Sequence, residues 1–510
     1  MEAGGRHTVA WDDSAVRSRR LSIAALPLVE RLTEVPNPQA FATRIRSLPF
    51  PLWLDSAATE NPHARYSYVT ADPSVVIRGF GARTEISRPH SGNPEWAPVN
   101  GHALAAGREL MRPFRNDPIP GLPPFQGGLA GYLGYEFAGA LERVPAPHRR
   151  DRSLPDVVLA LYDWVIAWDH YTSDAWIIST GVPAAGHERL NRAKTRLLQI
   201  KELLEEVTSV QDMAPGLPPT DDVGSAKPAG VVSTFSPAAY RAAVTRVRDY
   251  ILAGDIFQAN LSQQFAAPLP CQPFELYARL RSCNPAPFAA YFEVGGAAVL
   301  SVSPERFLRL EEDGSVETRP IKGTRPRGAD PGDDARLAQE LLSSDKDRAE
   351  NVMIVDLLRN DLSRVCRAGS IHVPSLCSLE SHPTVHHLVS VVQGRLSPGE
   401  DALSMLAAAF PGGSITGAPK VRAMEIIAEL EPTARSVYCG AIGYIGFSGA
   451  MDTSIAIRTA IAEDGKLYFN AGGGIVADSD PDAEYRETLD KAQAFIQVLS
   501  EGAVPEASVT

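Results

Sequence analysis

Short apolar runs bounded by glycine and proline recur along both halves of the chain, and they restrict the folds open to it. Runs typical of strands lie near 51–54, 66–69, 127–135, 157–168, 174–179, 436–447, 453–461 and 466–472. Helical patterns at 188–207, 236–253 and 481–499 accompany them without strict strand–helix alternation. We therefore predict an α+β fold in which large, mostly antiparallel β-sheets form a sandwich-like core flanked by helices, with two sequence halves sharing the architecture.

The length of 510 residues exceeds one ordinary core and indicates two to three domains. Residues 209–232 are rich in proline, glycine and aspartate and lack periodicity, so they are predicted to be a linker. This divides the chain into an N-terminal domain at 21–208 and a second domain at 233–500. The two halves can still share one sheet system. The glycine-dense run at 127–135 predicts a buried strand where backbones approach closely.

The charge and cysteine content exclude several classes of protein. A net charge of −12 argues against a general binder of nucleic acid or of membrane surfaces. Five cysteines without a Cys-x-x-Cys pair favour reduced thiols over a disulfide framework or zinc site. The sequence has neither an apolar run long enough to span a membrane nor a signal-peptide pattern at its start. We expect a cytoplasmic protein.

Lys322 lies in a cationic run between a restrictive proline and a permissive glycine, and we expect a short loop there. Its neighbours Arg319, Arg325 and Arg327 carry like charges, which favour the neutral amine and lower the pKa of a lysine. A neutral lysine amine is a nucleophile or a base. The alternative is a surface lysine in a basic loop, which is the usual setting of lysine.

Two predicted helices each carry carboxylates three residues apart. Asp347 and Glu350 follow Ser343-Ser344, and Glu484 and Glu487 follow a cap at Ser479 or Asp480, with Lys491 on the same face. Hard oxygen ligands on two sides of a cleft would suit Mg²⁺, with positions left for water and a substrate carboxylate. The alternative is a solvated surface with a Glu487–Lys491 ion pair.

A predicted strand at 452–461 places Arg458 on a face with Ser454, Ala456 and Ala460. Small neighbours leave room for a ligand, and the guanidinium fork matches a carboxylate. The next strand ends in Gly472–Gly474, where backbone N–H groups can approach an anion. His386 and His387 would point to opposite faces of a strand, one into the core and one toward a site. An edge-strand arginine and structural histidines are the alternatives.

These segments together resemble the chorismate-utilising enzymes. The matching runs keep the family's order across residues 236 to about 498: Gly254–Ser262, Ser303–Phe307, Pro320–Arg327, Arg348–Leu357, Pro411–Lys420 and 438–491. The first half resembles the family's first domain more weakly, through Leu54–Ala57 and Arg65–Ser67.

The resemblance implies a role for each matching position. Glu305 would be the general acid. Glu350 and Glu487 would bind Mg²⁺ directly, with Asp347 and Glu484 as water-bridged neighbours. The substrate would be held by Thr324, His387, Tyr438, Arg458, Gly472, Gly473, Gly474 and Lys491. Asp55 and Ser56 match a region where relatives bind tryptophan. Asp347 stands where some relatives have glutamate, which puts its water-bridging role in question.

Two positions separate the branches of this family. Members that add water have a lysine where this chain has Gln258, and anthranilate synthases have a small residue where it has Lys322. The aminodeoxychorismate synthases carry a Pro-Ile-Lys-Gly-Thr run with the lysine as a covalent nucleophile. The resemblance therefore implies conversion of chorismate and ammonia to 4-amino-4-deoxychorismate for para-aminobenzoate and folate synthesis.

The source of nitrogen and two rival functions follow from the same comparison. No glutaminase nucleophile segment is visible among the cysteines, so ammonia would come from a separate glutamine amidotransferase subunit in a heterodimer. The closest alternative is an anthranilate synthase component I. The other is a non-catalytic regulator that binds an aromatic metabolite, which would not require Glu305, Lys322, Glu350 and Glu487 together.

Overall fold

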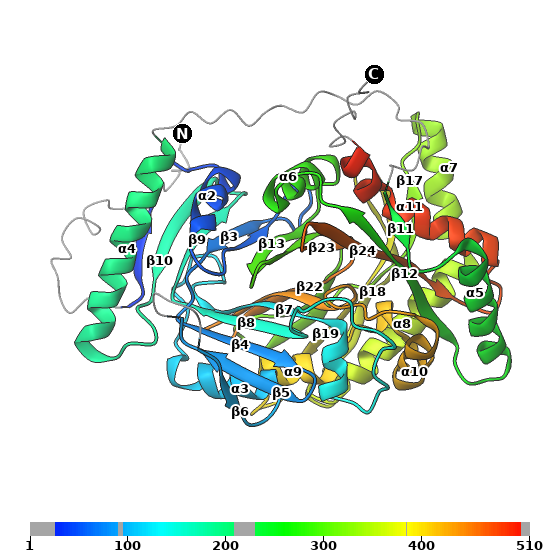
Figure 1. Ribbon diagram of the computed structural model, residues 1–510, viewed down its shortest axis with the longest axis horizontal. Coiled ribbons are helices and arrows are strands. Elements are labelled where there is room, and N and C mark those ends of the chain that lie inside the picture. Colours follow the sequence, from blue (N-terminus) through cyan, green and yellow to red (C-terminus); the bar gives the residue numbers. More distant parts are fainter. Residues whose placement is uncertain (1–25, 90–94, 209–229, 384, 501–510) are drawn as a thin grey trace, which may run out of the picture.

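A computed structural model describes residues 26–89, 95–208, 230–383 and 385–500. Most of the predicted linker lies outside these residues. Two 12-stranded sheets, here called sheet A and sheet B, lie one above the other (Figure 1). The pairings between the described strands are antiparallel, which confirms the predicted fold class.

Sheet A contains, in spatial order, β1 (Leu28–Arg31), β10 (Asp174–Ser179), β9 (Trp164–Asp169), β3 (Tyr66–Thr70), β2 (Leu52–Asp55), β13 (Phe288–Val294), β14 (Ala297–Ser303), β23 (Thr459–Glu463), β24 (Lys466–Ile475), β12 (Gln258–Pro268) and β11 (Val232–Ser233), with β20 (Gly417–Ala418) beside β12.

Sheet B contains β17 (Ile321–Pro326), β19 (Val385–Arg395), β16 (Ser315–Thr318), β15 (Arg306–Leu310), β22 (Met451–Ile455), β21 (Ala441–Gly446), β7 (Gly128–Leu133), β8 (Val157–Tyr162), β4 (Val75–Phe80), β5 (Arg83–Ser87) and β6 (Ala97–Val99), with β18 (His372–Ser381) beside β19.

Both sheets are built from both halves of the chain. Strand β2 pairs with β13 in sheet A, and β7 pairs with β21 in sheet B. The alternative left open by the sequence, a shared sheet system, is therefore what the structure contains. The domain boundaries at 208 and 233 stay a prediction.

The helices are α2 (Pro38–Arg44), α3 (Ala103–Met111), α4 (Gly186–Thr208), α5 (Pro237–Leu252), α6 (Pro273–Cys283), α7 (Pro331–Leu342), α8 (Asp345–Ser363), α9 (Ala402–Ala409), α10 (Lys420–Leu430) and α11 (Pro481–Ser500), with short 3₁₀ turns η1 (Ile45–Ser47), η2 (Arg112–Phe114), η3 (Tyr135–Ala140) and η4 (Gly413–Ile415). Their caps follow the sequence. Ser236 accepts the Ala239 N–H and Ser344 accepts the Asp347 N–H, which fixes where α5 and α8 begin. Within the described residues, no helix has both the length and the apolar character needed to cross a membrane.

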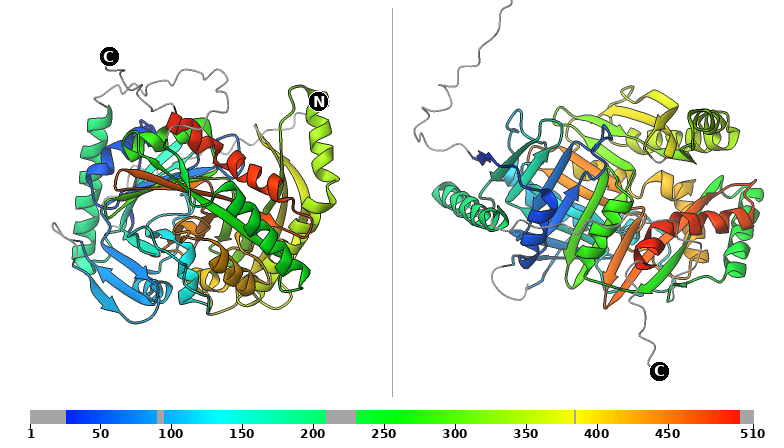
Figure 2. Two further views of the ribbon diagram at one scale, coloured as in Figure 1. Left: turned by 45° about the vertical axis from the view of Figure 1, so that its right-hand side comes forward. Right: turned by 90° about the horizontal axis from the view of Figure 1, so that it is seen from above.

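Three apolar layers hold these elements together. Helices α6 and α11 pack on the outer face of sheet A, as Figures 1 and 2 show from different sides. A second layer fills the space between the sheets, with Tyr132 from β7 and Phe292 from β13 in contact at 6.3 Å between ring centres. Helices α3, α9 and α10 contribute to a third layer with sheet B. The site described below lies where α8 and α11 meet the ends of these sheets.

The glycine-dense run forms β7, and its glycines permit the close backbone contact that the sequence predicts. Gly131 has a φ of +149°, and a Cβ placed on it would lie 2.1 Å from the carbonyl oxygen of Val158 in β8. No side chain fits in that space without moving a strand. Gly131 is therefore required by the pairing of β7 with β8.

Gly131→Ala is expected to lower the free energy of unfolding by more than about 2 kcal/mol, because backbone strain adds to a collision with β8. Urea unfolding measures the change. Gly449→Ala is a matched control, since Gly449 also has a positive φ, of +92°, but a Cβ there meets nothing within 4 Å. Equal losses in the two variants would show that the close contact contributes nothing beyond strain.

Candidate active site

A cleft with a volume of about 760 Å³ gathers most of the residues singled out in the sequence. Ligand sites commonly have roughly 300–1,000 Å³. Predicted residues that line it are Glu305, Lys322, Thr324, Asp347, Glu350, His387, Tyr438, Arg458, Gly472, Gly474, Glu484, Glu487 and Lys491. Gly473 does not line the cleft, but a Cβ on it would lie 3.0 Å from a carboxylate oxygen of Glu484.

Lys322 lies on β17, so the predicted loop is wrong. The proline and glycine around it form an irregularity within a strand, because the pairing with β19 shifts register between Ile321 and Thr324. Gly323 adopts a φ of +82° there. Such a bulge redirects a side chain, and the Lys322 Nζ donates to the Ser414 carbonyl oxygen at 3.0 Å.

The cause expected for a lowered lysine pKa also needs correction. Burial is the main reason that the pKa of Lys322 lies below its usual value, and the charge of Lys491 adds to the effect. The three arginines are instead paired with acids: Arg319 with Glu380, Arg325 with Glu340 and Asp347, and Arg327 with Asp334. The predicted lowering of the Lys322 pKa is therefore confirmed, but its cause is burial and not the neighbouring arginines.

Glu305 is a buried carboxyl between β14 and β15, with 5% of its surface exposed. Burial raises its pKa to about 7, although a hydrogen bond with the Ser414 side chain and the charge of Lys322 act in the opposite direction. A carboxyl with this pKa is partly protonated near neutral pH and can act as an acid. Ser414 thus contacts both Glu305 and Lys322.

The two acidic pairs face the cleft from α8 and α11. Burial raises the pKa of Glu350, and the carboxylates of Asp347 and Glu484 raise it further, while Lys322 and Lys346 lower it. Burial also raises the pKa of Glu484, and Lys346 lies 3.7 Å from it. The Glu487–Lys491 ion pair, which belonged to the alternative of a solvated helix surface, is present at 2.6 Å, although both residues line the cleft.

The donor set of these pairs suits Mg²⁺ in its chemistry. All four side chains offer hard oxygens. Other carboxylates add to the effect of burial in raising the pKa of Glu350 and of Glu484, so a nearby cation would stabilise their charged forms. Burial acts to raise the pKa of Glu487 as well, but Lys491 and Lys346 hold it below its usual value. Within the described residues, no group of three or more His, Cys, Asp and Glu side chains is arranged so that it could hold a metal ion. Bound Mg²⁺ would need oxygen ligands besides these carboxylates, such as water or substrate.

The sequence predicts that Arg458 lies within one continuous strand, and this is wrong. Arg458 lies in a link between the two sheets. Strand β22 ends at Ile455 in sheet B and β23 begins at Thr459 in sheet A. Arg458 has a φ of +48°, which is rare for a residue with a side chain. The alternation across 453–461 therefore breaks, yet the guanidinium still reaches the cleft, with a 3.4 Å contact to the Asn284 side chain.

The two adjacent histidines point to opposite faces of β19, as predicted. His387 lines the cleft and its Nδ1 lies 2.9 Å from the Thr324 hydroxyl. Burial lowers the pKa of His387 to about 3, so it is neutral at physiological pH. His386 is buried on the other face and contacts Asp334 at 2.9 Å.

Several residues that line the cleft were not predicted from the sequence. Asn260, Lys346, Ser414, Asn470 and Asp490 also line the cleft. Ser414 stands out, because it holds Lys322 and Glu305 together. Its only signal in the sequence is its place in the glycine-rich run at 411–420, where no spacing rule distinguishes it.

Asp55 and Ser56 line a second cavity of about 260 Å³ between the two sheets, together with Tyr66, Phe288 and Tyr444. Asp55 is fully buried and pairs with Arg281 at 2.5 Å. The Ser56 hydroxyl donates to the Tyr66 carbonyl oxygen at 2.6 Å. This cavity combines aromatic walls with a few polar groups.

A cleft that combines a carboxyl of raised pKa, a partly buried amine, two carboxylate pairs and an arginine has the features of an enzyme site for a small anionic substrate. The sequence profile of the chorismate binding enzymes matches residues 53–497. The chain therefore belongs to the family of chorismate binding enzymes.

Particular relatives narrow the choice without deciding it. Aminodeoxychorismate synthase component 1 of Escherichia coli strain K12 is 39% identical over 462 residues, covering 90% of this chain and 95% of that protein. Anthranilate synthase component 1 of Cereibacter sphaeroides is 40% identical over 444 residues, covering 87% of each. The crystal structure of anthranilate synthase component I from Streptococcus pneumoniae TIGR4 superposes with a TM-score of 0.71 at 31% identity, covering 86% of this chain and 93% of that one. Individual residues must separate the two reactions.

Proposed function

We propose that this enzyme is the synthase component that aminates chorismate to 4-amino-4-deoxychorismate. The observation that carries the proposal is the partly buried amine of Lys322, which donates to the Ser414 carbonyl oxygen beside the carboxyl of Glu305. An ortho-aminating enzyme needs no amine at this place. A binding-only regulator needs neither the amine nor a carboxyl with a pKa of about 7.

In the proposed reaction, the neutral amine of Lys322 attacks the ring carbon ortho to the ring carboxylate. Both ring double bonds shift, and the hydroxyl at the para carbon leaves as water with the proton of Glu305. Ammonia then attacks the para carbon, both double bonds shift back, and the Lys322 amine departs with the electron pair of its bond to the ring. The new ammonium group returns one proton to Glu305. The covalent step replaces one hard displacement by two easier ones.

The remaining cleft residues would hold the substrate. Arg458, Tyr438 and the backbone of Gly472–Gly474 would bind a substrate carboxylate, and this is supported by Arg458 and Tyr438 lining the cleft. Lys491 donates to the Gly472 carbonyl oxygen at 2.9 Å beside them. Neutral His387 would lie against the ring of the substrate, with its orientation fixed by the hydrogen bond between its Nδ1 and the Thr324 hydroxyl. Mg²⁺ held by Glu350 and Glu487, with Asp347 and Glu484 beside them, would neutralise the other carboxylate of the substrate.

Chelation of divalent cations by EDTA is expected to abolish turnover, and added Mg²⁺ to restore it. Glu350→Gln should raise the Mg²⁺ concentration for half-maximal rate by at least roughly tenfold, because a direct ligand is lost. Asp356→Asn is the matched control, since Asp356 lies on the same helix with 78% of its side chain exposed. Full activity in EDTA would contradict the metal assignment.

We further propose that ammonia reaches the cleft from a separate glutamine amidotransferase subunit in the cytoplasm. The five cysteines lie at 271, 283, 366, 377 and 439, and none has glycines on both sides in the manner of a glutaminase nucleophile. Cys439 has a glycine on one side, and burial raises the pKa of its thiol to about 12. A thiol of that pKa is a poor nucleophile. The isolated chain should use ammonium salts but not glutamine.

The product identifies the reaction. The chain is incubated with chorismate, Mg²⁺ and ammonium, and products are followed by mass and fluorescence. Para-amination gives a product that keeps the enolpyruvyl group and lacks anthranilate fluorescence. Release of pyruvate with a fluorescent product would instead make the chain an anthranilate synthase component.

The cavity at Asp55 and Ser56 suits an aromatic amino acid such as tryptophan, with its ring between the aromatic walls. Tryptophan at 100 times its Kd is expected to stabilise the fold by about 2.7 kcal/mol. The midpoint of thermal unfolding with tryptophan, and with alanine as control, measures this. Equal midpoints at millimolar concentrations of both amino acids would remove the assignment.

A further inference from the structure

A buried ion pair between Glu431 and Arg435 lies behind the wall of the catalytic cleft. The Arg435 Nη2 and Nε atoms lie 2.7 and 2.9 Å from the two carboxylate oxygens of Glu431. The exposed fraction is 1% for the Arg435 side chain and 6% for the Glu431 side chain. Neither lines the catalytic cleft, and neither has a role in the reaction described above.

The pair completes the open edge of strand β12. Strand β20 pairs with Gln258 and Ala259 only. At the next residue, the Asn260 N–H donates to the Thr416 carbonyl oxygen, and the Asn260 carbonyl oxygen accepts from Arg435 Nη2 at 2.5 Å. Two residues along, the Ser262 N–H and hydroxyl donate to Glu431 at 2.7 and 2.9 Å. The two side chains thus take the place of a neighbouring strand and fix Asn260, which lines the cleft.

The same guanidinium holds the turn that contacts the reacting groups. Arg435 Nη1 donates to the Ile415 carbonyl oxygen at 3.0 Å. The preceding residue, Ser414, accepts from the Lys322 amine through its carbonyl and bonds Glu305 through its side chain. One planar group therefore fixes two adjacent segments of the wall against which Lys322 and Glu305 rest.

The base of Arg435 is itself held in place. Both carboxylate oxygens of Glu136 accept backbone N–H groups, from Arg435 at 2.7 Å and from Ser436 at 2.8 Å. The Tyr135 ring lies 4.5 Å from the guanidinium carbon. Since Tyr438 follows three residues later and lines the cleft, the segment 435–438 connects this buried anchor with the site.

We propose that Arg435, oriented by Glu431, is a positioning residue that sets the placement of Lys322 and Glu305 through the Ser414–Ile415 turn and Asn260. This proposal rests on the proposed function only because it takes Lys322 and Glu305 as the reacting groups. A lysine keeps the positive charge but lacks the planar fork, so it cannot reach Glu431, Ile415 and Asn260 together.

Arg435→Lys is expected to lower kcat by about 10- to 100-fold, because small displacements of reacting groups have costs of this size. The KM for chorismate should change by less than about threefold, since Arg458 and the groups on α11 remain in place. Total consumption of chorismate with Mg²⁺ and ammonium is the readout, so the result does not depend on which product forms. Product identity tests the proposed function separately.

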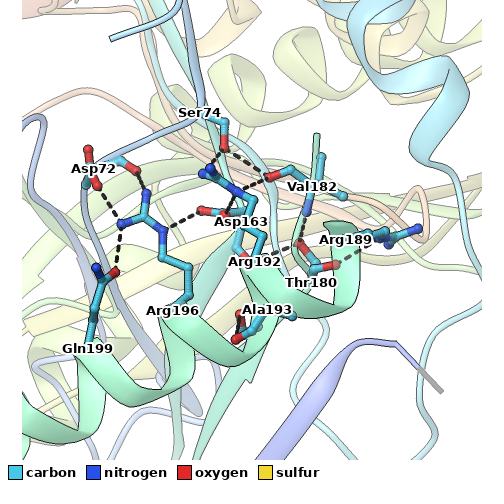
Figure 3. A network of polar contacts seen from close by, with 11 residues as sticks. Asp72, Ser74, Asp163, Thr180, Val182, Arg189, Arg192, Ala193, Arg196 and Gln199 are labelled. Atoms are coloured by element: carbon cyan, nitrogen blue, oxygen red, sulfur yellow. Dashed lines mark hydrogen bonds and ion pairs between the residues drawn. The ribbon is translucent and has the colours of Figure 1, made fainter. Parts of the chain in front are cut away.

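Arg192→Lys provides a matched control in another buried ion pair. Figure 3 shows Arg192 reaching from α4 to the buried Asp163, with 2.7 Å between its Nε and the carboxylate and 3.0 Å from Nη2 to the Ser74 hydroxyl. None of these residues lines the catalytic cleft. Arg192→Lys should lower the unfolding midpoint and leave kcat within about twofold of the unmodified protein.

Glu431→Gln provides the second variant, because it keeps the size of the side chain and removes its charge. It should reproduce the loss of kcat with little change in KM. The proposal is overturned if folded Arg435→Lys keeps its kcat, or if its loss equals that of Arg192→Lys. It is also overturned if both Arg435→Lys and Glu431→Gln fail to fold while Arg192→Lys folds, which would make the pair purely structural.

Discussion

Lys322→Ala is expected to abolish formation of 4-amino-4-deoxychorismate, with a loss in kcat of at least roughly 1,000-fold, as for other covalent nucleophiles. Without the amine, the ortho carbon of the ring is no longer blocked by a covalent bond. Ammonia can then attack that carbon directly. A slow, anthranilate-type product should therefore replace the para product, and fluorescence and mass should detect it.

The fold should survive this change, because the Lys322 amine makes one hydrogen bond, to Ser414, and is replaced by a small apolar group. Circular dichroism and the unfolding midpoint check this. Lys201→Ala is a control for loss of a lysine, since Lys201 lies on α4, pairs with Glu30 of β1 and does not line the cleft. Para-amination at the unmodified rate in Lys322→Ala would exclude the nucleophile assignment.

Glu305→Gln is expected to lower kcat by about 10²- to 10⁴-fold, the range for loss of a general acid. Glutamine is similar in shape and can still bond Ser414, so binding of chorismate should change little. The pH dependence gives an independent readout. Glu305 must be protonated to act, and its pKa is about 7, so kcat/KM should fall as the pH rises through about 7.

The sign of this effect separates Glu305 from other groups in the cleft. Below its pKa the acid is fully protonated and contributes fully, while above it the active fraction falls tenfold for each pH unit. The Glu305→Gln variant should lack this fall at alkaline pH. If the variant keeps the same alkaline limb and most of its kcat, another group is the acid.

Most of the side chains that line the cleft could be predicted from residue types and local spacing, together with the family resemblance. Carboxylates three residues apart on α8 and α11 face one cleft, as helical spacing dictates. The strands and the caps of α5 and α8 also follow local rules of periodicity and capping.

Features set by tertiary packing could not be predicted in this way. The chain crosses between the sheets at Arg458, which periodicity within 453–461 cannot show, because both parts remain apolar and buried. Burial, and not the neighbouring arginines, lowers the pKa of Lys322, since those arginines form ion pairs with acidic side chains. The contacts of Arg435 also join distant segments. Asn260 of β12 lies 175 residues away in the sequence, and Ile415 of η4 lies 20 residues away.

The position of nitrogen in the product tests the central claim most directly. Chorismate, Mg²⁺ and ¹⁵N-ammonium are incubated with the protein, and NMR locates the labelled nitrogen on the ring. Attack by Lys322 at the ortho carbon predicts that nitrogen is bound to the carbon para to the ring carboxylate. Nitrogen on the ortho carbon would contradict the account.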